Sequence, residues 1–418
     1  MSFGNPLFGG ATLNGQSLLT QFVDWSSRIN NTLYVISGNE GGGGIPVPSD
    51  SYNGMTISFS RQNGGVFNQV DPNNNFTEAP TGGRRTVDLV APGQNINMPA
   101  LNGVNVVSSG TSFAAPHVTA TDALLQQFAA QQIANNVPRW NANAQQHEVM
   151  KAVLMNSADK IRDDGTFVFN GNVVPQGGLL GMEKTITNTA GNNWTQSDAF
   201  TSRTIPLDAQ MGTGQLNASR ALTQFKPGQY PSFGSATVPV IGWDYGTLLG
   251  DDDVNKYIFD QPLQGGSFVS ITLDWDRLVN LNDTNMNGRY DVGETFTSVG
   301  LTDLDLYLMP EGATDLAQNI WSSISSVDSV EHIFHQIPIT GDYEFWVREV
   351  GPVAGDNPFQ RYGVAWWADA VPEPSALLLV GSALFFLVIL HSLKLFGYGN
   401  EAGQLRRLWG PMRAQGRG

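Results

Sequence analysis

The sequence predicts an α/β domain with a doubly wound parallel sheet, followed by an antiparallel β-sandwich and a C-terminal transmembrane helix. The first prediction rests on residues 16–36, where an amphipathic helical pattern leads into an apolar strand. The second rests on short β-rich runs, separated by turns, over residues 236–369. The third rests on the apolar run at residues 376–390, which precedes a basic end.

Length and composition exclude several classes of protein. A chain of 418 residues is long for one domain, so two domains and a tail are expected. The net charge of −15 and the lack of a basic stripe argue against nucleic acid as a partner, because nothing is present to neutralise phosphates. The chain has no Cys, which excludes disulfides and a catalytic thiol.

The first predicted helix covers residues 16–29 and leads into a strand that begins at Tyr34. One face of this helix is apolar and carries Leu18, Leu19, Phe22, Trp25 and Ile29. Asp24 lies on the opposite, polar side, so we interpret it as a solvated surface carboxylate. The alternation of a helix with an apolar strand is typical of a doubly wound α/β fold.

Residues 104–132 predict a strand that turns sharply into a helix. A β-branched run stops at Ser108-Ser109-Gly110, and apolar residues recur at helical spacing from Ser112 onward. A hydroxyl at a helix start suits a nucleophile, since the first-turn amides and the helix dipole favour the negative charge of an oxyanion. Ser and Thr are also common helix caps, so these residues alone leave both interpretations open.

A longer comparison favours the nucleophile. Residues 110–117 (GTSFAAPH) resemble the nucleophile motif of the subtilisin-like serine peptidases, or subtilases. Four more segments follow that family's order: residues 34–40, 87–93, 149–158 and 212–218. The resemblance covers roughly residues 1–225 and implies a subtilisin-like catalytic domain with Ser112 as nucleophile and Asn39 in the oxyanion hole. It also implies a substrate cleft lined by Ser2, Phe3, Gly4, Ser37 and Gly38.

Two members of the catalytic triad implied by the resemblance are missing. The family orders its triad as aspartate, histidine and serine, yet no His precedes Ser112. His117 occupies the family's Pro-His position, where packing is the expected role. A truncated gene product is our leading explanation, in which case the protein is an extracellular serine endopeptidase of peptides and proteins and the chain as written is inactive. The alternatives are a surface-anchored pseudoenzyme and a calcium-dependent binding protein.

Residues 226–235 predict a linker, and residues 236–370 predict the β-sandwich. This second region resembles the accessory β-sandwich domains that follow many secreted peptidases, through its Leu-Asp-Trp-Asp strand at residues 273–276 and its Asp-Leu-Asp-Leu-Tyr-Leu strand at residues 303–308. Such a module is expected to stabilise the protein or to bind a ligand, without chemistry of its own.

A calcium site is predicted within this module. Residues 283–294 carry oxygen side chains at loop positions 1, 3, 5, 9 and 12 and Gly at position 6, which is the EF-hand calcium pattern. A hairpin turn rich in Asn, Asp and Gly is the alternative. The predicted ligands of a structural calcium ion are Asp283, Asn285, Asn287, the Arg289 carbonyl, Asp291 and Glu294.

Residues 371–418 predict a sorting signal. They contain Val-Pro-Glu-Pro-Ser, the apolar run and then a basic end. This arrangement resembles the bacterial C-terminal signal that exosortases read, which implies export, anchoring by a transmembrane helix and contact with exosortase-type sorting machinery. The protein is then at the cell surface, or secreted after sorting. Basic residues stay on the cytoplasmic side, so residues 1–370 are expected outside.

Overall fold

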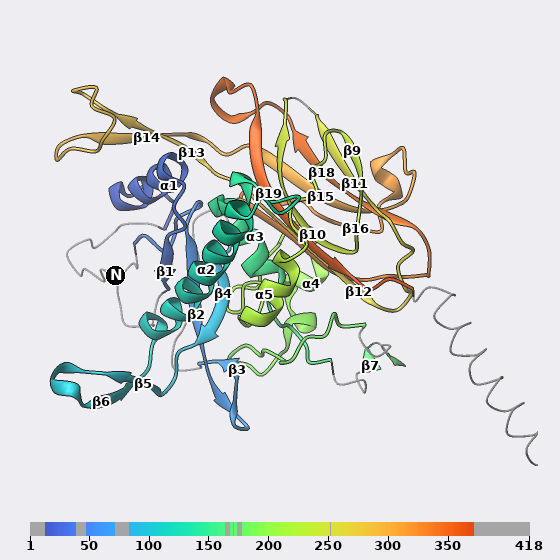
Figure 1. Ribbon diagram of the computed structural model, residues 1–418, viewed down its shortest axis with the longest axis horizontal. Helices are drawn as coiled ribbons and strands as arrows, with labels where there is room; N and C mark the ends of the chain where they lie inside the picture. The colour runs from blue at the N-terminus through green and yellow to red at the C-terminus, as the bar shows by residue number, and fades with distance from the viewer. Residues whose placement is uncertain are drawn as a thin grey trace, which may run out of the picture. The chain divides into compact units, whose positions relative to one another are not determined.

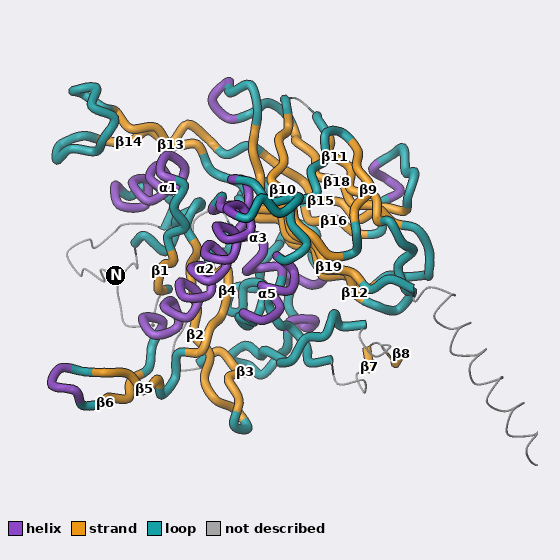
Figure 2. Tube along the Cα trace, viewed as in Figure 1, coloured by secondary structure: helices purple, strands orange, loops and turns teal. Residues whose placement is uncertain are grey.

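The computed structural model describes residues 13–38, 47–71, 83–163, 168–169, 171–173, 178–250 and 252–371. The described residues as far as Ala370 form one compact unit. Figure 2 shows that long helices belong to the first half of this unit, whereas strands dominate the second half. In the part of the chain that is described, no helix has both the length and the apolar character needed to cross a membrane. The predicted transmembrane run at residues 376–390 lies outside the described residues.

A small parallel sheet forms the centre of the first half. Strand β2 (Met55–Asn63) lies between β1 (Val35–Ser37) and β4 (Val87–Pro92), and both pairings are parallel. Strand β3 (Val66–Val70) pairs antiparallel with the end of β2. The long helix α2 (Thr111–Ala134) packs against β1, β2 and β4 (Figure 1). The predicted α/β architecture is therefore confirmed for these three parallel strands.

The remaining elements of the first half surround this sheet. Helix α1 precedes β1, a β-hairpin precedes α2, and shorter helices follow α2. They are α1 (Leu18–Asn30), β5 (Ile96–Pro99), β6 (Asn105–Ser108), α3 (His147–Asn156), β7 (Val168–Phe169), β8 (Asn172–Val173), α4 (Asp198–Thr201) and α5 (Ala218–Phe225).

Helix α1 forms where the sequence predicts it, but its orientation differs from the prediction. The Ser17 side chain caps its start by accepting the Thr20 N–H at 3.2 Å. Leu18 and Ile29 are about half exposed, at 50% and 51%. Asp24, predicted to be a solvated surface carboxylate, is fully buried, so that prediction is wrong. Its side of the helix faces other segments of the chain instead of water.

The second half is a β-sandwich of two sheets, as predicted. The first sheet has the order β10 (Ile241–Leu248), β19 (Gln360–Ala368), β12 (Phe268–Asp274), β17 (Val330–Gln336). The second has the order β16 (Trp321–Ser323), β15 (Asp303–Pro310), β18 (Tyr343–Val350), β11 (Val254–Phe259), β9 (Ser235–Val238). All pairings are antiparallel except β9 with β11. Both sheets contribute to one apolar core, in which the Tyr257 and Phe345 rings stack 4.6 Å apart.

The two halves pack tightly against each other through α3. This helix contacts β19, β12 and β10 of the first sandwich sheet. Gly363 in β19 lies so close to α3 that a Cβ there would be 2.4 Å from the Glu148 carbonyl oxygen. At the same junction, Lys151 of α3 forms a buried ion pair with Asp274 of β12 at 3.0 Å. Burial favours the neutral amine and so lowers the pKa of Lys151. The negative charges of Asp274 and Asp88 raise it by more, so the net pKa lies above the ordinary value.

A second contact between the halves comes from a hairpin that carries the predicted calcium loop. Strands β13 (Leu278–Asn282) and β14 (Thr295–Gly300) pair antiparallel and extend past α1 (Figure 1). Trp25 of α1 packs against Val279 and Phe296 of this hairpin in one apolar cluster. The sandwich is thus attached to the α/β half at both α3 and α1.

Candidate active site

The turn before α2 gives Ser112 an exposed position at a helix start. Gly110, the N-cap residue of α2, has φ 145°, a backbone conformation that side chains with a Cβ rarely adopt. Its N–H donates to the Gly93 carbonyl, just beyond β4, at 2.9 Å. Thr111 is buried, whereas Ser112 is exposed. No side chain caps α2, so the capping interpretation of Ser112 is not what the structure shows.

The turn is also tied to the end of β1. The Thr111 hydroxyl donates to the Gly38 carbonyl at 2.9 Å, and the Gly38 N–H donates to Ile57 of β2 at 3.0 Å. Ser37, a predicted cleft residue, ends β1 and is buried. The carboxyl ends of β1 and β4 thus meet at the first turn of α2, which is where ligands bind in open parallel sheets. The structure brings Ser37 and Gly38 to the turn that holds Ser112.

The other predicted active-site residues fall outside the described part of the chain. Asn39 follows Gly38 directly but is not described, and the same holds for Ser2, Phe3 and Gly4. Their predicted roles therefore stay predictions.

The described residues provide no general base for Ser112. His117 Nδ1 lies 2.8 Å from the Phe113 carbonyl oxygen on the same helix. The other described histidines have partners in the second half: His147 with Asp276, His332 with Thr272, and His335 stacked on Trp321. Among the described residues the Ser112 hydroxyl has no hydrogen-bond partner. The site as described thus contains an exposed hydroxyl at a helix N-terminus, without a base.

The predicted calcium loop closes the β13–β14 hairpin. Asp283 Oδ2 accepts the Gly288 N–H at 2.7 Å, and Asp283 Oδ1 accepts the Asn287 N–H at 3.3 Å. These backbone hydrogen bonds, that from Gly288 first, lower the pKa of Asp283. The Asp283 carboxylate, at loop position 1, therefore points across the loop toward Gly288, at position 6, and the two N–H groups hold it there.

Glu294, the last residue of the loop, folds back against the first half of the loop. Glu294 is buried, and its carboxylate accepts the N–H of Thr284 at 2.8 Å and that of Asp291 at 2.9 Å. The amide nitrogens of Asn285 and Asn287 both donate to Asp291 Oδ2 at 2.7 Å. Three predicted ligand side chains, those of Asn285, Asn287 and Asp291, thus meet at one carboxylate oxygen. The side-chain oxygens of Asn285 and Asn287 accept the N–H groups of Asn287 and Arg289 at 3.1 and 2.8 Å. Calcium binding by this loop stays a prediction.

Sequence reasoning missed a second polar cluster at the junction of the halves. His147 and Glu148 begin α3, and Asp276 follows β12; all three side chains are buried. The three residues can each offer one ligand atom, and these atoms lie within 4.8 Å of one another. His147 and Asp276 are 129 residues apart, so no local motif reveals the cluster.

Comparison with known proteins supports the resemblance in part. Residues 1–196 match the family model of the subtilase family, which confirms the resemblance for somewhat less than half of the chain. No curated protein is similar in sequence. This match ends at residue 196, so the role of the β-sandwich as an accessory module and the C-terminal sorting signal stay predictions.

Three solved structures are similar to parts of the chain. The patellamide maturation protease PatA is 20% identical with a TM-score of 0.31, over 50% of this chain and 57% of that one. The prenylagaramide maturation protease PagA is 20% identical with a TM-score of 0.29, over 48% of this chain and 52% of that one. PliG from Aeromonas hydrophila, a periplasmic inhibitor of g-type lysozyme, is 12% identical with a TM-score of 0.20, over 33% of this chain and 98% of that one. The chain spans little more than half the length of the two proteases.

Proposed function

We propose that this protein is a serine endopeptidase in which Ser112 attacks the peptide carbonyl. The observation that carries the proposal is the turn at Gly110, which exposes Ser112 at the N-terminus of α2 and lies within the residues that match the subtilase family. The helix N-terminus favours the negative charge that develops on the carbonyl oxygen. The Ser112 N–H and the Asn39 side-chain amide are the proposed oxyanion donors.

The reaction also needs a base, because a serine hydroxyl is a weak nucleophile until its proton is removed. In this mechanism a histidine oriented by an aspartate accepts the proton and later gives it to the leaving amine. The four described histidines have other partners. We therefore assign the base and its aspartate to residues outside the described ones, and we expect the 418-residue chain by itself to be inactive.

Reaction with a fluorophosphonate probe tests the nucleophile. The test uses a form of the protein that contains the histidine base and its aspartate. In this form Ser112→Ala is expected to abolish both labelling and peptide hydrolysis. Asn39→Ala is expected to slow hydrolysis ~10²–10³-fold, because one oxyanion donor is lost. The 418-residue chain should label far more slowly than that form. Mass spectrometry of the labelled peptide identifies the modified residue.

Ser109→Ala is the matched control, since Ser109 is exposed three residues earlier and its hydroxyl accepts the Asn95 N–H. This variant should label like the parent. Labelling of the 418-residue chain at Ser112 as fast as that of the form with the base would refute the assignment of the base.

We also propose that the loop at residues 283–294 binds calcium. The supporting observation is that its donors already converge and that the loop packs on α1: the Tyr290 ring contacts Phe22 at 5.8 Å and stacks on Phe296 at 5.4 Å. An ion that orders this loop also holds the hairpin against the α/β half. A calcium-dependent binding function is the second candidate for the whole protein, and it rests on this loop.

Calcium is expected to raise the melting temperature of the full-length chain by mass action, since it binds only the folded loop. Glu294→Ala removes the bidentate ligand and should abolish this response. Glu311→Ala, which changes a Glu in another turn of the sandwich, serves as the control and should respond like the parent. If Glu294→Ala melts with the same calcium dependence as the parent, the loop is a turn and not a calcium site.

The predicted cellular location rests on the sequence alone. We propose that the protein is exported, that exosortase-type machinery reads its C-terminal signal, and that the apolar run anchors it in the membrane before processing. Detection of residues 13–370 on intact cells by added protease tests this proposal, and a protein that stays protected until the cells are lysed contradicts it.

A further inference from the structure

A cavity of about 350 Å³ lies where α1 and α3 meet the β-sandwich. Its lining includes His147 and Glu148 from the first turn of α3 and Asp276 from the segment after β12. These side chains are 3%, 5% and 7% exposed. Buried carboxylates and a buried imidazole are costly unless they are paired, so their gathering around one cavity calls for an occupant or a partner.

The imidazole of His147 is held in one orientation. The Asn31 side-chain nitrogen donates to the Gln145 carbonyl at 3.0 Å, which turns the Asn31 oxygen toward His147. That oxygen lies 2.9 Å from the His147 N–H and 3.1 Å from Nδ1. Nδ1–H then donates to Asn31, and Nε2–H donates to Asp276 Oδ1 at 3.0 Å; a metal ion bound at Nε2 takes the place of this second proton. Histidines that bind metals are oriented by a second-nitrogen hydrogen bond of this kind.

Two carboxylate oxygens of the cluster lack hydrogen bonds. Asp276 Oδ2 has no hydrogen-bond partner, and Glu148 Oε2 has only an ionic contact with His147 Nδ1 at 3.2 Å. Both belong to side chains that are more than nine-tenths buried and that line the cavity. Unsatisfied buried oxygens of this type are costly, and coordination of a cation satisfies them.

We propose that His147, Glu148 and Asp276 form a binding site for a divalent transition-metal ion, with zinc as the best fit. One nitrogen and two carboxylate oxygens are ligands that zinc accepts, and ligands at ~2.0–2.2 Å in a tetrahedron lie ~3.3 Å apart. The His147–Asp276 separation of 3.0 Å is already close to that value, and all three ligand atoms lie within 4.8 Å. The cavity leaves a fourth position for water or for a ligand, as in zinc sites with three protein ligands.

The charge of Arg28 acts on Asp276 across the cavity, but neither arginine that lines it can serve as a metal ligand. Arg28 and Arg361 line it, but Arg28 donates to the Val279 carbonyl at 2.9 Å, and Arg361 lies 5.9 Å from the Tyr245 ring. A guanidinium also lacks a lone pair for coordination. Because His147 and Glu148 come from the α/β half and Asp276 from the sandwich, the ion joins the two halves.

The test uses the full-length chain, stripped of metal and titrated with Zn²⁺ and Co²⁺. We expect one zinc per chain by elemental analysis, a rise in melting temperature, and a visible Co²⁺ spectrum with the intensity of a four-coordinate site. Asp276→Asn should weaken zinc binding at least ~10-fold, and His147→Gln should abolish the Co²⁺ spectrum. Asn31→Ala should weaken binding ~10–100-fold, as does the loss of other residues that orient metal ligands.

Asp342→Asn is the matched control, because it makes the same change at an exposed turn of the sandwich and should leave zinc binding intact. Circular dichroism identifies any variant that fails to fold. For the variants that do fold, the Co²⁺ spectrum then shows whether the metal site is intact. The proposal is overturned if the folded parent binds no stoichiometric zinc, or if a folded His147→Gln variant binds zinc and gives the Co²⁺ spectrum of the parent.

Discussion

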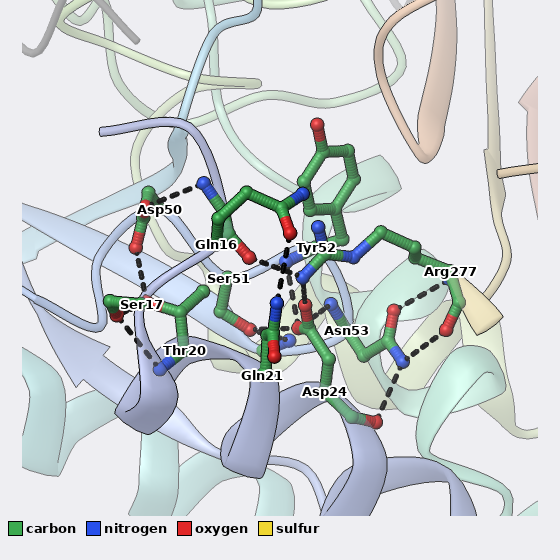
Figure 3. A network of polar contacts seen from close by, with 12 residues as sticks. Gln16, Ser17, Thr20, Gln21, Asp24, Asp50, Ser51, Tyr52, Asn53 and Arg277 are labelled. Carbon is green, nitrogen blue, oxygen red and sulfur yellow. Dashed lines mark hydrogen bonds and ion pairs between the residues drawn. The ribbon is translucent and has the colours of Figure 1, made fainter. Parts of the chain in front are cut away.

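Arg277→Met is expected to lower the free energy of unfolding by about 3–5 kcal/mol, because it leaves the buried carboxylate of Asp24 without its charge partner. Asp24 is fully buried and Arg277 is 3% exposed. The two side chains form an ion pair, Asp24 from α1 and Arg277 from the segment after β12 (Figure 3). The residue that remains cannot regain water without opening the contact between the two halves.

The surrounding hydrogen bonds hold the Asp24 carboxylate in place. Asp24 Oδ1 accepts the Ser51 hydroxyl at 2.6 Å and the N–H groups of Tyr52 and Asn53 at 2.9 and 3.0 Å. Asn53 in turn accepts the Arg277 N–H at 2.7 Å, and its amide nitrogen donates to the Arg277 carbonyl at 3.0 Å (Figure 3). The network thus joins α1, the loop before β2 and the sandwich.

Urea unfolding of the full-length chain measures the effect, with Arg162→Met as the control for the loss of an exposed arginine. The control should change stability by less than ~0.5 kcal/mol, as surface substitutions usually do. The double variant Asp24→Asn with Arg277→Met should recover part of the loss, since no unpaired charge is then buried. A loss below ~1 kcal/mol for Arg277→Met would mean that the pair contributes little.

The features that the sequence predicted correctly are the local ones. Helix α1, strand β1 and helix α2 follow from apolar spacing within single segments, and the position of Ser112 follows from the break at Gly110. The calcium loop is also local, because all its side chains come from twelve consecutive residues. The structure shows a turn in which Asp283 and Glu294 accept backbone N–H groups, and calcium binding by it stays a prediction.

The features that the sequence did not reveal depend on contacts across the two halves. Helical periodicity places Asp24 on the polar side of α1, but it cannot show that this side faces Arg277, 253 residues away. The same limit hides the cluster of His147 with Asp276. Polarity of a helix face predicts solvent only when no other segment covers that face, and here the sandwich does.

Lys160→Met is expected to raise the free energy of unfolding at neutral pH by about 1–4 kcal/mol, the range seen when buried ionic groups are replaced by apolar ones. Lys160 is fully buried, and its Nζ lies 5.1 Å from the Phe334 ring centre and 5.5 Å from that of Trp194. Among the described residues its side chain makes one hydrogen bond, to the Ala158 carbonyl at 3.5 Å. Met keeps the length of the side chain and removes the amine.

The same substitution should remove one contribution to the dependence of stability on pH. Burial, followed by the charge of Arg220, lowers the pKa of Lys160 well below its ordinary value. Between that lowered pKa and ~10.4 the unfolded chain binds a proton that the folded chain does not, so stability rises with pH and is lost as pH falls, by up to ~1.4 kcal/mol per pH unit. Below ~6.5 a further loss is expected from His332 and His335, whose pKa values burial lowers, that of His335 to about 4.

Urea unfolding at pH 6, 7, 8 and 9 separates these contributions. Other groups titrate in this range in both proteins, such as His147: burial lowers its pKa, but its carboxylate neighbours raise it to about 9, which makes stability fall as pH rises. Their contributions cancel in the comparison, so the stability of the parent relative to Lys160→Met should fall steadily from pH 9 to 6. Lys226→Met, at an exposed position just after α5, is the matched control and should keep the parent's slope. Parallel curves for the parent and Lys160→Met would show that Lys160 is protonated in the folded protein. Its charge would then have to be held by the two aromatic rings and the Ala158 carbonyl, an arrangement that Lys160→Met should destabilise instead of stabilise.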